Sequence, residues 1–202
     1  SSQEKWMYER KLVMQKSALF APEKYNIISE IEKYSHIPDK KAILYHNTEG
    51  EDISVTYQQL IEQSNKVGNV LASHGLSKGD KVLIMMPRSI ATYELYIAAL
   101  KLGVAIIPCS EYRITHGEIN AVIALEPFTV EFEKIKEYDA LTKFVIAGQK
   151  DGWISLEAEK ENASNKLEMA DTTRDDMAIL SYTSGTTGNP KAVTHCHGWG
   201  FA

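Results

Sequence analysis

The sequence is short of several features that would each point to a particular class of protein. It has 202 residues but only two cysteines, too few for the disulfide framework of a small secreted domain. The formal net charge is −5, so the basic excess typical of nucleic-acid-binding proteins is missing. No apolar run reaches the roughly 20 residues of a transmembrane helix, and the first residues lack a signal-peptide core. These absences predict a cytoplasmic protein without a membrane span or a nucleic-acid partner; they leave the oligomeric state open.

The composition that remains is that of an ordinary globular protein with an α/β pattern. Hydrophobic residues make up 44% of the chain and charged residues 24%. Short, nearly continuous apolar runs alternate with amphipathic stretches, as strands and helices do in a parallel sheet covered on both faces. We therefore predict a three-layer α/β domain around a mainly parallel sheet, with strands near 81–86, 104–108, 121–125 and 143–147.

The segments around these runs predict further elements. Thr56 is a plausible N-cap for a helix that ends at Gly75, and a second helix covers Ile90 to Leu102. Amphipathic spacing also predicts a helix from Pro127 to Tyr138, whereas the charged stretch from Asp151 to Asp176 is typical of a solvated connection.

The beginning of the chain predicts smaller elements that pack on this sheet. We expect a helix within residues 1–20, and a second from Ile27 to Tyr34 that is capped by Asn26. An edge hairpin pairs Ala42–Tyr45 with Ile53–Val55. We expect three parts: N-terminal helices and the edge hairpin over 1–55, an α/β subdomain over 56–170, and a strand with a ligand-binding loop that opens a second, truncated subdomain over 171–202.

The most informative stretch runs from Leu180 to Lys191 and reads Leu-Ser-Tyr-Thr-Ser-Gly-Thr-Thr-Gly-Asn-Pro-Lys. An apolar run at 177–180 predicts a strand before it, and Ala192-Val193 predicts a return strand or turn after it. Glycines let backbone N–H groups approach a ligand, hydroxyls donate to anionic oxygens, and the lysine adds a positive charge. The stretch therefore predicts a polyphosphate-binding loop, with candidate residues Thr183, Ser184, Gly185, Thr186, Thr187, Gly188 and Lys191.

The loop matches neither of two common nucleotide-binding motifs. A Walker loop requires Gly-Lys-Ser/Thr running into a helix, but Pro190 here separates Asn189 from Lys191. A Gly-x-Gly-x-x-Gly motif is also missing, because Gly185 and Gly188 stand alone. By composition alone, a solvated hairpin loop is the alternative.

The order of the residues resembles a known signature. Tyr-Thr-Ser-Gly-Thr-Thr-Gly-x-Pro-Lys resembles the phosphate-binding signature of the adenylate-forming enzymes: acyl-CoA synthetases, firefly luciferase and peptide-synthetase adenylation domains. A second stretch, VTYQQL…HGLSKGDKVLIMMPRS…AALKLGVAIIPC, is similar to the N-terminal part of the same family. The residues around Arg88 and Pro108 are most similar to those of the acetyl and medium-chain acyl-CoA synthetases. By itself, Arg88 would be interpreted as a solvated arginine at the end of a strand.

This resemblance implies a ligase that activates a carboxylic acid, a fatty acid of short to medium chain, with ATP and Mg²⁺. An acyl-adenylate forms first, and coenzyme A then takes the acyl group and releases AMP. The loop residues would bind rather than react, and the catalytic groups of the family lie beyond Ala202, so no catalytic residue is predicted here. We expect an N-terminal part of the large domain that is inactive alone. The alternatives are an amino-acid or aryl-acid adenylating enzyme, or a non-catalytic nucleotide-binding module.

Residues after the loop carry weaker signals. The run His195-Cys196-His197, even with Cys109, fits no standard zinc spacing, so no metal site is predicted. His195 follows Lys191 by four positions, where the resembled family carries a histidine near the acyl pocket. It is thus a candidate substrate contact, or a histidine hydrogen-bonded to backbone. Trp199 and Phe201 are candidates for a pocket wall or for the core.

One junction departs from the resembled family. The residues 115–120 begin a helix, yet the strand at 121–125 follows at once, where relatives carry further helical residues. Either the chain has a real deletion here or residues are missing between Asn120 and Ala121. We favour missing residues, and so expect the two Cα atoms to lie farther apart than the roughly 3.8 Å of a trans peptide.

Overall fold

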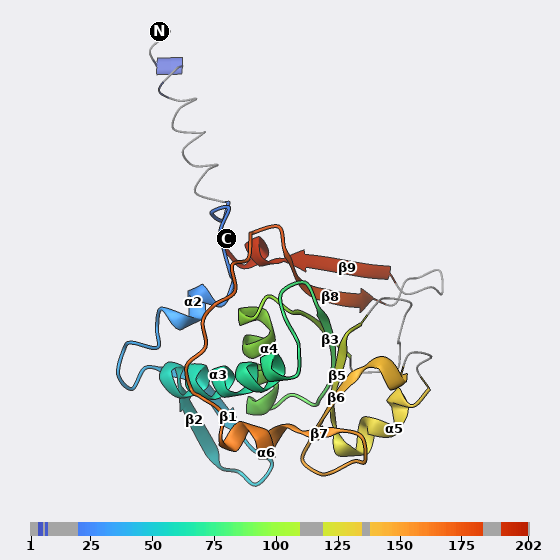
Figure 1. The fold of residues 1–202 in the computed structure, drawn as a ribbon. Helices are drawn as coiled ribbons and strands as arrows, with labels where there is room; N and C mark the ends of the chain where they lie inside the picture. Colours follow the sequence, from blue (N-terminus) through green and yellow to red (C-terminus); the bar gives the residue numbers. More distant parts are fainter. Residues whose placement is uncertain are drawn as a thin grey trace.

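The computed structural model describes residues 4, 5, 7, 20–109, 119–134, 138–183 and 191–201. Within these ranges a seven-stranded sheet has the order β7-β6-β5-β3-β4-β8-β9 (Figure 1). All neighbouring strands are parallel up to β8, and β9 returns antiparallel to β8. The mainly parallel α/β sheet is therefore confirmed. Its strands are β3 (Lys81–Met85), β4 (Ala105–Pro108), β5 (Ala121–Leu125), β6 (Thr142–Ile146), β7 (Ile154–Ser155), β8 (Met177–Thr183) and β9 (Lys191–Cys196).

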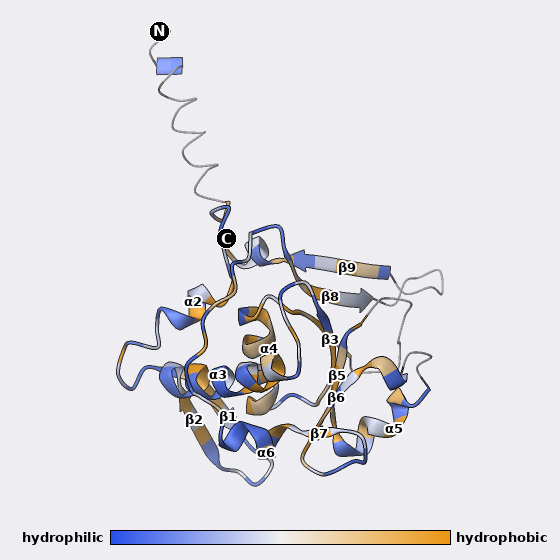
Figure 2. Cartoon of the chain, viewed as in Figure 1, coloured by the Kyte–Doolittle hydropathy of each residue, from blue (hydrophilic) through white to orange (hydrophobic). Residues whose placement is uncertain are grey.

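Helices cover both faces of the sheet, as predicted. The helices α3 (Tyr57–Ser73), α4 (Ile90–Lys101) and α6 (Leu156–Glu161) lie on one face, and the short α5 (Thr129–Phe132) lies on the other (Figure 1). Alternate residues of β3 enter the two cores, because successive strand side chains point to opposite faces. Val82 and Ile84 join the core under α3 and α4, whereas Leu83 and Met85 join the core beside α5. The helix α4 is accordingly coloured mostly as hydrophobic, whereas the outer strand β9 is partly hydrophilic (Figure 2).

Local signals in the sequence explain where the two long helices begin and end. The Thr56 hydroxyl accepts a hydrogen bond from Gln59 N–H while the Gln59 side chain accepts from Thr56 N–H, which is a complete capping box. Gly75 follows α3 with φ +92°, and Gly103 follows α4 with φ +75°. Both positions lie in the left-handed region, where glycine carries no Cβ penalty.

The hairpin and the second N-terminal helix match the prediction in kind but differ in extent, whereas the helix expected within residues 1–20 lies mostly outside the described residues. The strands β1 (Lys41–His46) and β2 (Asp52–Thr56) pair antiparallel in a two-stranded sheet of their own beside α3. The helix α2 (Ser29–Glu32) is one turn long, shorter than the predicted Ile27–Tyr34 helix. The predicted cap by Asn26 was wrong: the N-cap is Ile28, without a side-chain bond, and Asn26 Oδ1 instead accepts from Ile28 N–H at 3.0 Å in the turn before the helix. Residues 27–28 and 33–34 are turns, so the prediction was wrong at both ends of the helix.

Two predicted segments after β5 need correction. The helix expected from Pro127 to Tyr138 is divided into a 3₁₀ turn (Glu126–Phe128), α5 and a second 3₁₀ turn (Tyr138–Ala140). In the second of these turns, the Tyr138 hydroxyl accepts from Trp153 Nε1–H at 2.9 Å. The connection from Asp151 to Asp176 is more than solvated surface, because it supplies β7, α6 and the buried residues Trp153, Leu156 and Thr172.

The start of β5 is fixed by Asn120. Its N–H donates to Lys81 O at 2.9 Å, and its Oδ1 accepts from Lys81 N–H at 2.8 Å. The crossover from β4 to β5 comprises residues 109–120, close to the minimum of about a dozen for parallel strands. Most of it, residues 110–118, lies outside the described residues, and the spacing of the Asn120 and Ala121 Cα atoms stays a prediction.

Among the described residues, no helix combines the length and the apolar character that crossing a membrane requires.

Candidate functional site

The candidate loop connects two paired strands. The ladder between β8 and β9 runs from Met177 opposite Cys196 at one end to Thr183 opposite Lys191 at the other. We call the first end the base of the hairpin and the second its open end. The candidate residues Ser184, Gly185, Thr186, Thr187 and Gly188 all lie outside the described residues. The described strands nevertheless fix both ends of the loop, because directly opposite residues have Cα atoms about 4.5–5.5 Å apart.

The open end lies at the carboxyl edge of the parallel sheet. The strand β8 runs parallel to β4, with Ile179 opposite Ile106, and therefore ends on the same side as Pro108. In open α/β sheets ligands bind outside the carboxyl ends of the strands. Lys191 begins β9, and the first four residues of this strand are exposed. Lys191 is thus an exposed residue at this edge, and its role toward a ligand stays a prediction.

The base of the hairpin is held by Asp176 and its surroundings. The Asp176 carboxylate accepts from Thr173 N–H at 2.7 Å and lies 3.2 Å from Lys78 Nζ. The hydrogen bond from Thr173, together with the charge of Lys78, lowers the pKa of Asp176 below its ordinary value. The backbone carbonyl of the same residue accepts from His197 N–H at 2.9 Å. Asp176 therefore links the turn before β3, the entry into β8 and the exit from β9.

A segment from the beginning of the chain lies against this base, and we call residues 21–28 the N-terminal strap (Figure 1). Tyr25 N–H donates to Thr172 O at 3.0 Å, and the Thr172 hydroxyl returns a bond to Tyr25 O at 2.8 Å. Arg174 contributes two more contacts: its N–H donates to Glu23 O, and its Nη1 donates to Ala21 O, both at 2.9 Å. The strap therefore packs on the residues that lead into β8.

The two histidines after the loop lie in different surroundings. His195 is half-buried, and its ring centroid lies 4.7 Å from that of Trp199, which is 60% exposed. His197 is 0% exposed, and its Nδ1 accepts from Ile27 N–H of the strap at 3.1 Å. His197 is thus hydrogen-bonded to backbone, although the sequence had suggested it only as part of a possible metal-binding run. Burial lowers the pKa of His197, against a smaller opposite influence from Asp176.

The remaining residues that the sequence singled out lie apart from one another. Phe201 packs edge-to-face on Tyr25, with ring centroids 5.5 Å apart, so it belongs to the contact with the strap. Arg88 is exposed, as its ordinary interpretation predicted. Cys109 follows β4 and Cys196 ends β9. In the ranges that the structure describes, no three His, Cys, Asp or Glu side chains are grouped so as to hold a metal ion.

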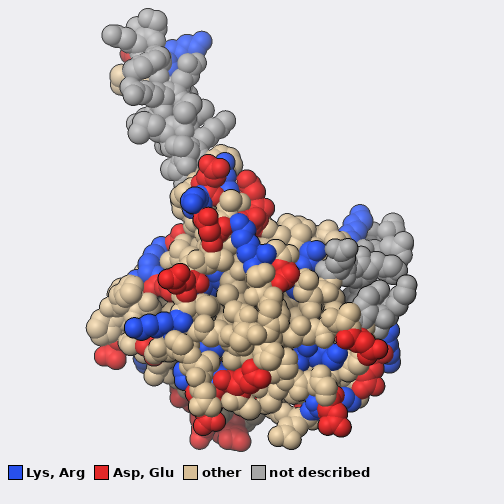
Figure 3. Space-filling model, in the orientation of Figure 1, with Lys and Arg blue, Asp and Glu red and all other residues tan. Residues whose placement is uncertain are grey.

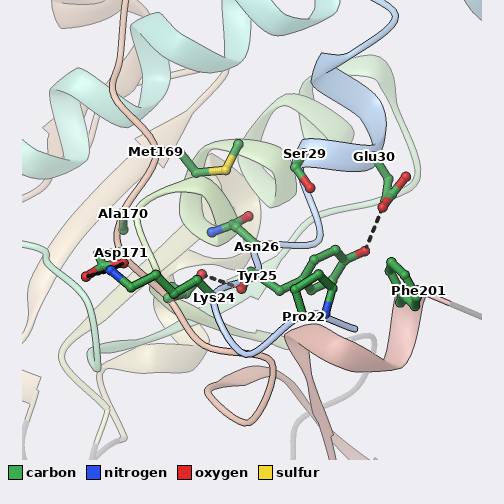
Figure 4. A pocket seen from close by; sticks show the side chains of 11 residues that line it. Pro22, Lys24, Tyr25, Asn26, Ser29, Glu30, Met169, Ala170, Asp171 and Phe201 are labelled. Atoms are coloured by element: carbon green, nitrogen blue, oxygen red, sulfur yellow. Dashed lines mark hydrogen bonds and ion pairs between the residues drawn. The ribbon is translucent and has the colours of Figure 1, made fainter. Parts of the chain in front are cut away.

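A pocket of about 510 Å³ lies beside the strap rather than at the open end (Figure 4). Its walls come from the strap, from α2, from residues 169–172 and from Phe201. The Tyr25 hydroxyl donates to Glu30 at 3.2 Å inside it, and Lys24 pairs with Asp171 at 3.3 Å. Burial, followed by the charge of Glu30, raises the pKa of Tyr25 to about 12. On the face drawn in Figure 3, basic and acidic side chains are interspersed around a broad neutral area.

Known proteins resemble this chain in both sequence and fold. A family model described as AMP-binding enzyme matches residues 32–199. The uncharacterized acyl-CoA ligase YtcI of Bacillus subtilis (strain 168) is 42% identical over 201 residues, which cover 94% of this chain and 37% of that protein. The 4-hydroxybutyrate–CoA ligase 1 of Metallosphaera sedula is 30% identical over 184 residues, or 85% of this chain and 32% of that protein.

Solved structures give the same correspondence. The crystal structure of ATP-bound MatB from Rhodopseudomonas palustris superposes with a TM-score of 0.72 at 28% identity, over 86% of this chain and 35% of that one. The chain therefore spans between 32% and 37% of the length of these three relatives.

Proposed function

This chain belongs to the AMP-binding enzyme family, and from that premise we propose that its β8–β9 hairpin binds the polyphosphate of ATP in an AMP-forming acyl-CoA ligase. The protein would activate a carboxylic acid of short to medium chain length. The acid's carboxylate attacks the α-phosphorus of ATP to give an acyl-adenylate and pyrophosphate. The thiol of coenzyme A then attacks the acyl carbon, forms the thioester and releases AMP.

The observation that carries this proposal is the pairing of Thr183 with Lys191 across the open end. This register brings the last residue before the loop and the cation after it to neighbouring positions at the carboxyl edge of the sheet. Pyrophosphate is the leaving group of the first step, so its developing charge must be held in line and neutralised. A lysine beside a loop of hydroxyls and backbone N–H groups can supply such charge-assisted contacts.

The proposed roles are therefore binding roles. The loop would hold the β- and γ-phosphates of MgATP through Thr183, Ser184, Gly185, Thr186, Thr187, Gly188 and Lys191. His195, half-buried beside the exposed Trp199 on the strand that leaves the loop, would contact the acid. We assign no catalytic residue within these 202 residues and expect this part alone not to turn over.

Support for the acid class comes from the relatives. One of them is named a 4-hydroxybutyrate–CoA ligase and another an acyl-CoA ligase. We propose the cytoplasm as the compartment, because a chain of this size with two cysteines suits a reducing environment.

The test is acid-dependent exchange of labelled pyrophosphate into ATP by the full-length protein. The panel should contain acetate, straight-chain acids of increasing length, hydroxy acids, aromatic acids and amino acids. We expect exchange with a short or medium acid and, once coenzyme A is added, the corresponding thioester. Exchange with only an aromatic or amino acid would disprove the proposed acid class. The adenylation proposal itself fails if no acid in the panel supports exchange.

A further inference from the structure

We propose that His197 is a positioning residue for the nucleotide loop: its uncharged imidazole fastens the base of the β8–β9 hairpin to the N-terminal strap. This inference rests on the proposed function of the loop. His197 lies at the base of the hairpin, at the opposite end of the ladder from Lys191. It acts through β9, whose last residue precedes it directly and whose first residue, Lys191, is at the open end.

Three segments meet at this side chain. The backbone N–H of His197 donates to Asp176 O, and its Nδ1 accepts from Ile27 N–H, which is 170 positions away. The flanking glycines allow this close approach. A Cβ atom on Gly198 would lie 3.0 Å from Arg174 O, and one on Gly200 would lie 2.3 Å from Ile27 Cδ1. The exit from β9 is therefore enclosed by backbone and by the strap.

The contact with the strap requires a neutral ring. Since Nδ1 accepts a hydrogen bond, it carries a lone pair, and the proton of a neutral imidazole must then be on Nε2. Nε2 is buried and has no hydrogen-bond partner among the described residues. A protonated ring would present Nδ1–H to Ile27 N–H, so two donors would face each other. Protonation therefore breaks the bond that joins the strap to the hairpin.

The charged groups around the His197 ring do not favour its protonation strongly enough to overcome burial. Asp176, on the turn before β8, favours the protonated ring, but Lys78, on the turn before β3, opposes it. The guanidinium of Arg174, on that same turn before β8, donates to Ala21 O of the strap. Burial outweighs these charges and keeps the ring neutral. The strap contact should weaken only as the pH falls below about 6.5, the ordinary pKa of histidine.

A shift at the base would reach the open end through the ladder. The pairing of β8 with β9 is irregular between Met177 and Ile179, directly beside the base. Such bulges set the direction in which a strand continues, and a one-residue slip turns every side chain to the opposite face. Fixing the end of β9 through His197 therefore fixes which residue stands opposite Thr183, and hence where the Lys191 cation points.

The experiment compares three substitutions in the full-length protein. His197→Leu keeps a similar volume but removes the acceptor. His197→Asn places its Oδ1 the same number of bonds from the backbone as Nδ1, so it restores an acceptor that cannot titrate. His36→Leu is the control, because His36 is an exposed histidine on the turn after α2. The readouts are KM for ATP and kcat in acid-dependent pyrophosphate exchange between about pH 5.5 and 8, together with Tm.

We expect His197→Leu to raise KM for ATP about tenfold at pH 7.5, the scale of one lost buried hydrogen bond, with a smaller change in kcat. His197→Asn should restore a low KM. The KM of the wild-type protein should rise on the acid side, and that of the Asn variant should not. His36→Leu should behave as the wild type.

Several results would overturn the inference. A His197→Leu protein with a lowered Tm but the wild-type KM in its folded fraction would make the residue merely structural. If the Leu variant does not fold, the Asn variant decides, because an acid-side rise in its KM equal to that of the wild type excludes the imidazole as the cause.

A wild-type protein that exchanges with no acid would instead disprove the proposed function. The inference about the base is then decided by amide hydrogen exchange in β8 and β9 at pH 5.5 and 7.5, corrected for intrinsic rates. Faster opening in acid, abolished by His197→Asn, supports the coupling. Equal protection at both pH values contradicts it.

Discussion

The two ends of the β8–β9 hairpin are built for different tasks. At the base, buried His197 and partly buried Asp176 are hydrogen-bonded to the strap and to neighbouring turns. At the open end, β9 begins with four exposed residues, and the sequence between the strands consists of Ser, Gly, Thr, Asn and Pro. We therefore expect the base to determine where the hairpin lies and the open end to contribute less to folding.

The contrast also concerns distance along the chain. The contacts at the base join residues 153 and 170 positions apart, so they form only when the whole domain has folded. At the open end, the described contacts are those of the local pairing between β8 and β9. A site arranged in this way separates stability from ligand binding, and substitutions at the two ends should have separate consequences.

The largest expected effect is on catalysis and comes from the open end. In the full-length protein, Lys191→Ala should remove about 2–4 kcal/mol of transition-state stabilisation, as the loss of other electrostatic clamps does. Its Tm should change little, because exposed charges contribute about 0–1 kcal/mol to stability. Thr186→Val should act in the same direction but less, since it removes one neutral donor. Pyrophosphate exchange measures the first effect and a thermal melt the second.

Either of two outcomes would contradict the assignment of Lys191 to ligand binding rather than to stability. Exchange at the wild-type rate by Lys191→Ala would mean that the open end is not the phosphate site. A large fall in Tm with unchanged exchange would mean that Lys191 serves the fold. Lys191→Arg is the matched control, because it keeps the charge but changes the geometry of the donors.

The base should show the opposite behaviour when Asp176 is replaced. Asp176→Ala removes the acceptor for Thr173 N–H and the ion pair with Lys78, and should lower the unfolding free energy by about 1–2 kcal/mol, discounted for a carboxylate that is 35% exposed. Asp176→Asn keeps an acceptor and should lose less. Melting temperatures of the full-length variants at neutral pH measure both losses.

The direction of the pKa shift determines how the stabilisation by Asp176 changes with pH. The folded state lowers the pKa of Asp176, so the stabilisation is present above the ordinary aspartate pKa of about 3.9 and is lost as the pH falls through the lower folded value. The wild-type and Asp176→Ala proteins should therefore converge in Tm in acid. A constant difference down to the lowest usable pH would contradict the assignment of the stabilisation to the carboxylate.

The sequence predicted the sheet well because short, continuous apolar runs between turn signals have few structural interpretations other than buried strands. The strands β3, β4, β5 and β6 are buried on both faces, and the observed bounds lie within one residue of the predicted ones at each end. The caps of α3 could also be predicted, since Thr56 and Gly75 act through local backbone chemistry. The polyphosphate loop was predicted through its resemblance to the adenylate-forming enzymes, and its residue roles stay predictions.

The features that the sequence did not predict depend on contacts between distant residues. His197 is buried and accepts a hydrogen bond from Ile27 N–H, and nothing in the run His195-Cys196-His197 indicates this partner. The broken helix near Phe132 has an amphipathic pattern, but Trp153 determines how its end packs. The stretch around Leu156 was interpreted as solvated surface because charged residues outnumber the few apolar ones that hold it to the sheet.

The smallest expected effect is on stability and comes from replacing Tyr25 in the N-terminal strap, which packs on the base of the hairpin. Tyr25 is 7% exposed and donates its hydroxyl to Glu30 at 3.2 Å, and burial followed by the charge of Glu30 raises its pKa to about 12. The folded protein thus keeps this proton while the unfolded chain loses it near pH 10, so the stabilisation present below pH 10 disappears between about pH 10 and 12. Tyr25→Phe should cost about 0.5–1 kcal/mol at neutral pH and should weaken the alkaline loss of Tm, because no phenol remains to ionise. Glu30→Gln should keep most of that alkaline loss, since burial rather than charge is the larger cause. The measurement is Tm from about pH 8 to 12 for the wild type and both variants. If Tm of Tyr25→Phe falls in alkali as much as that of the wild type, the strap is held by its backbone bonds to Thr172 and not by this hydroxyl.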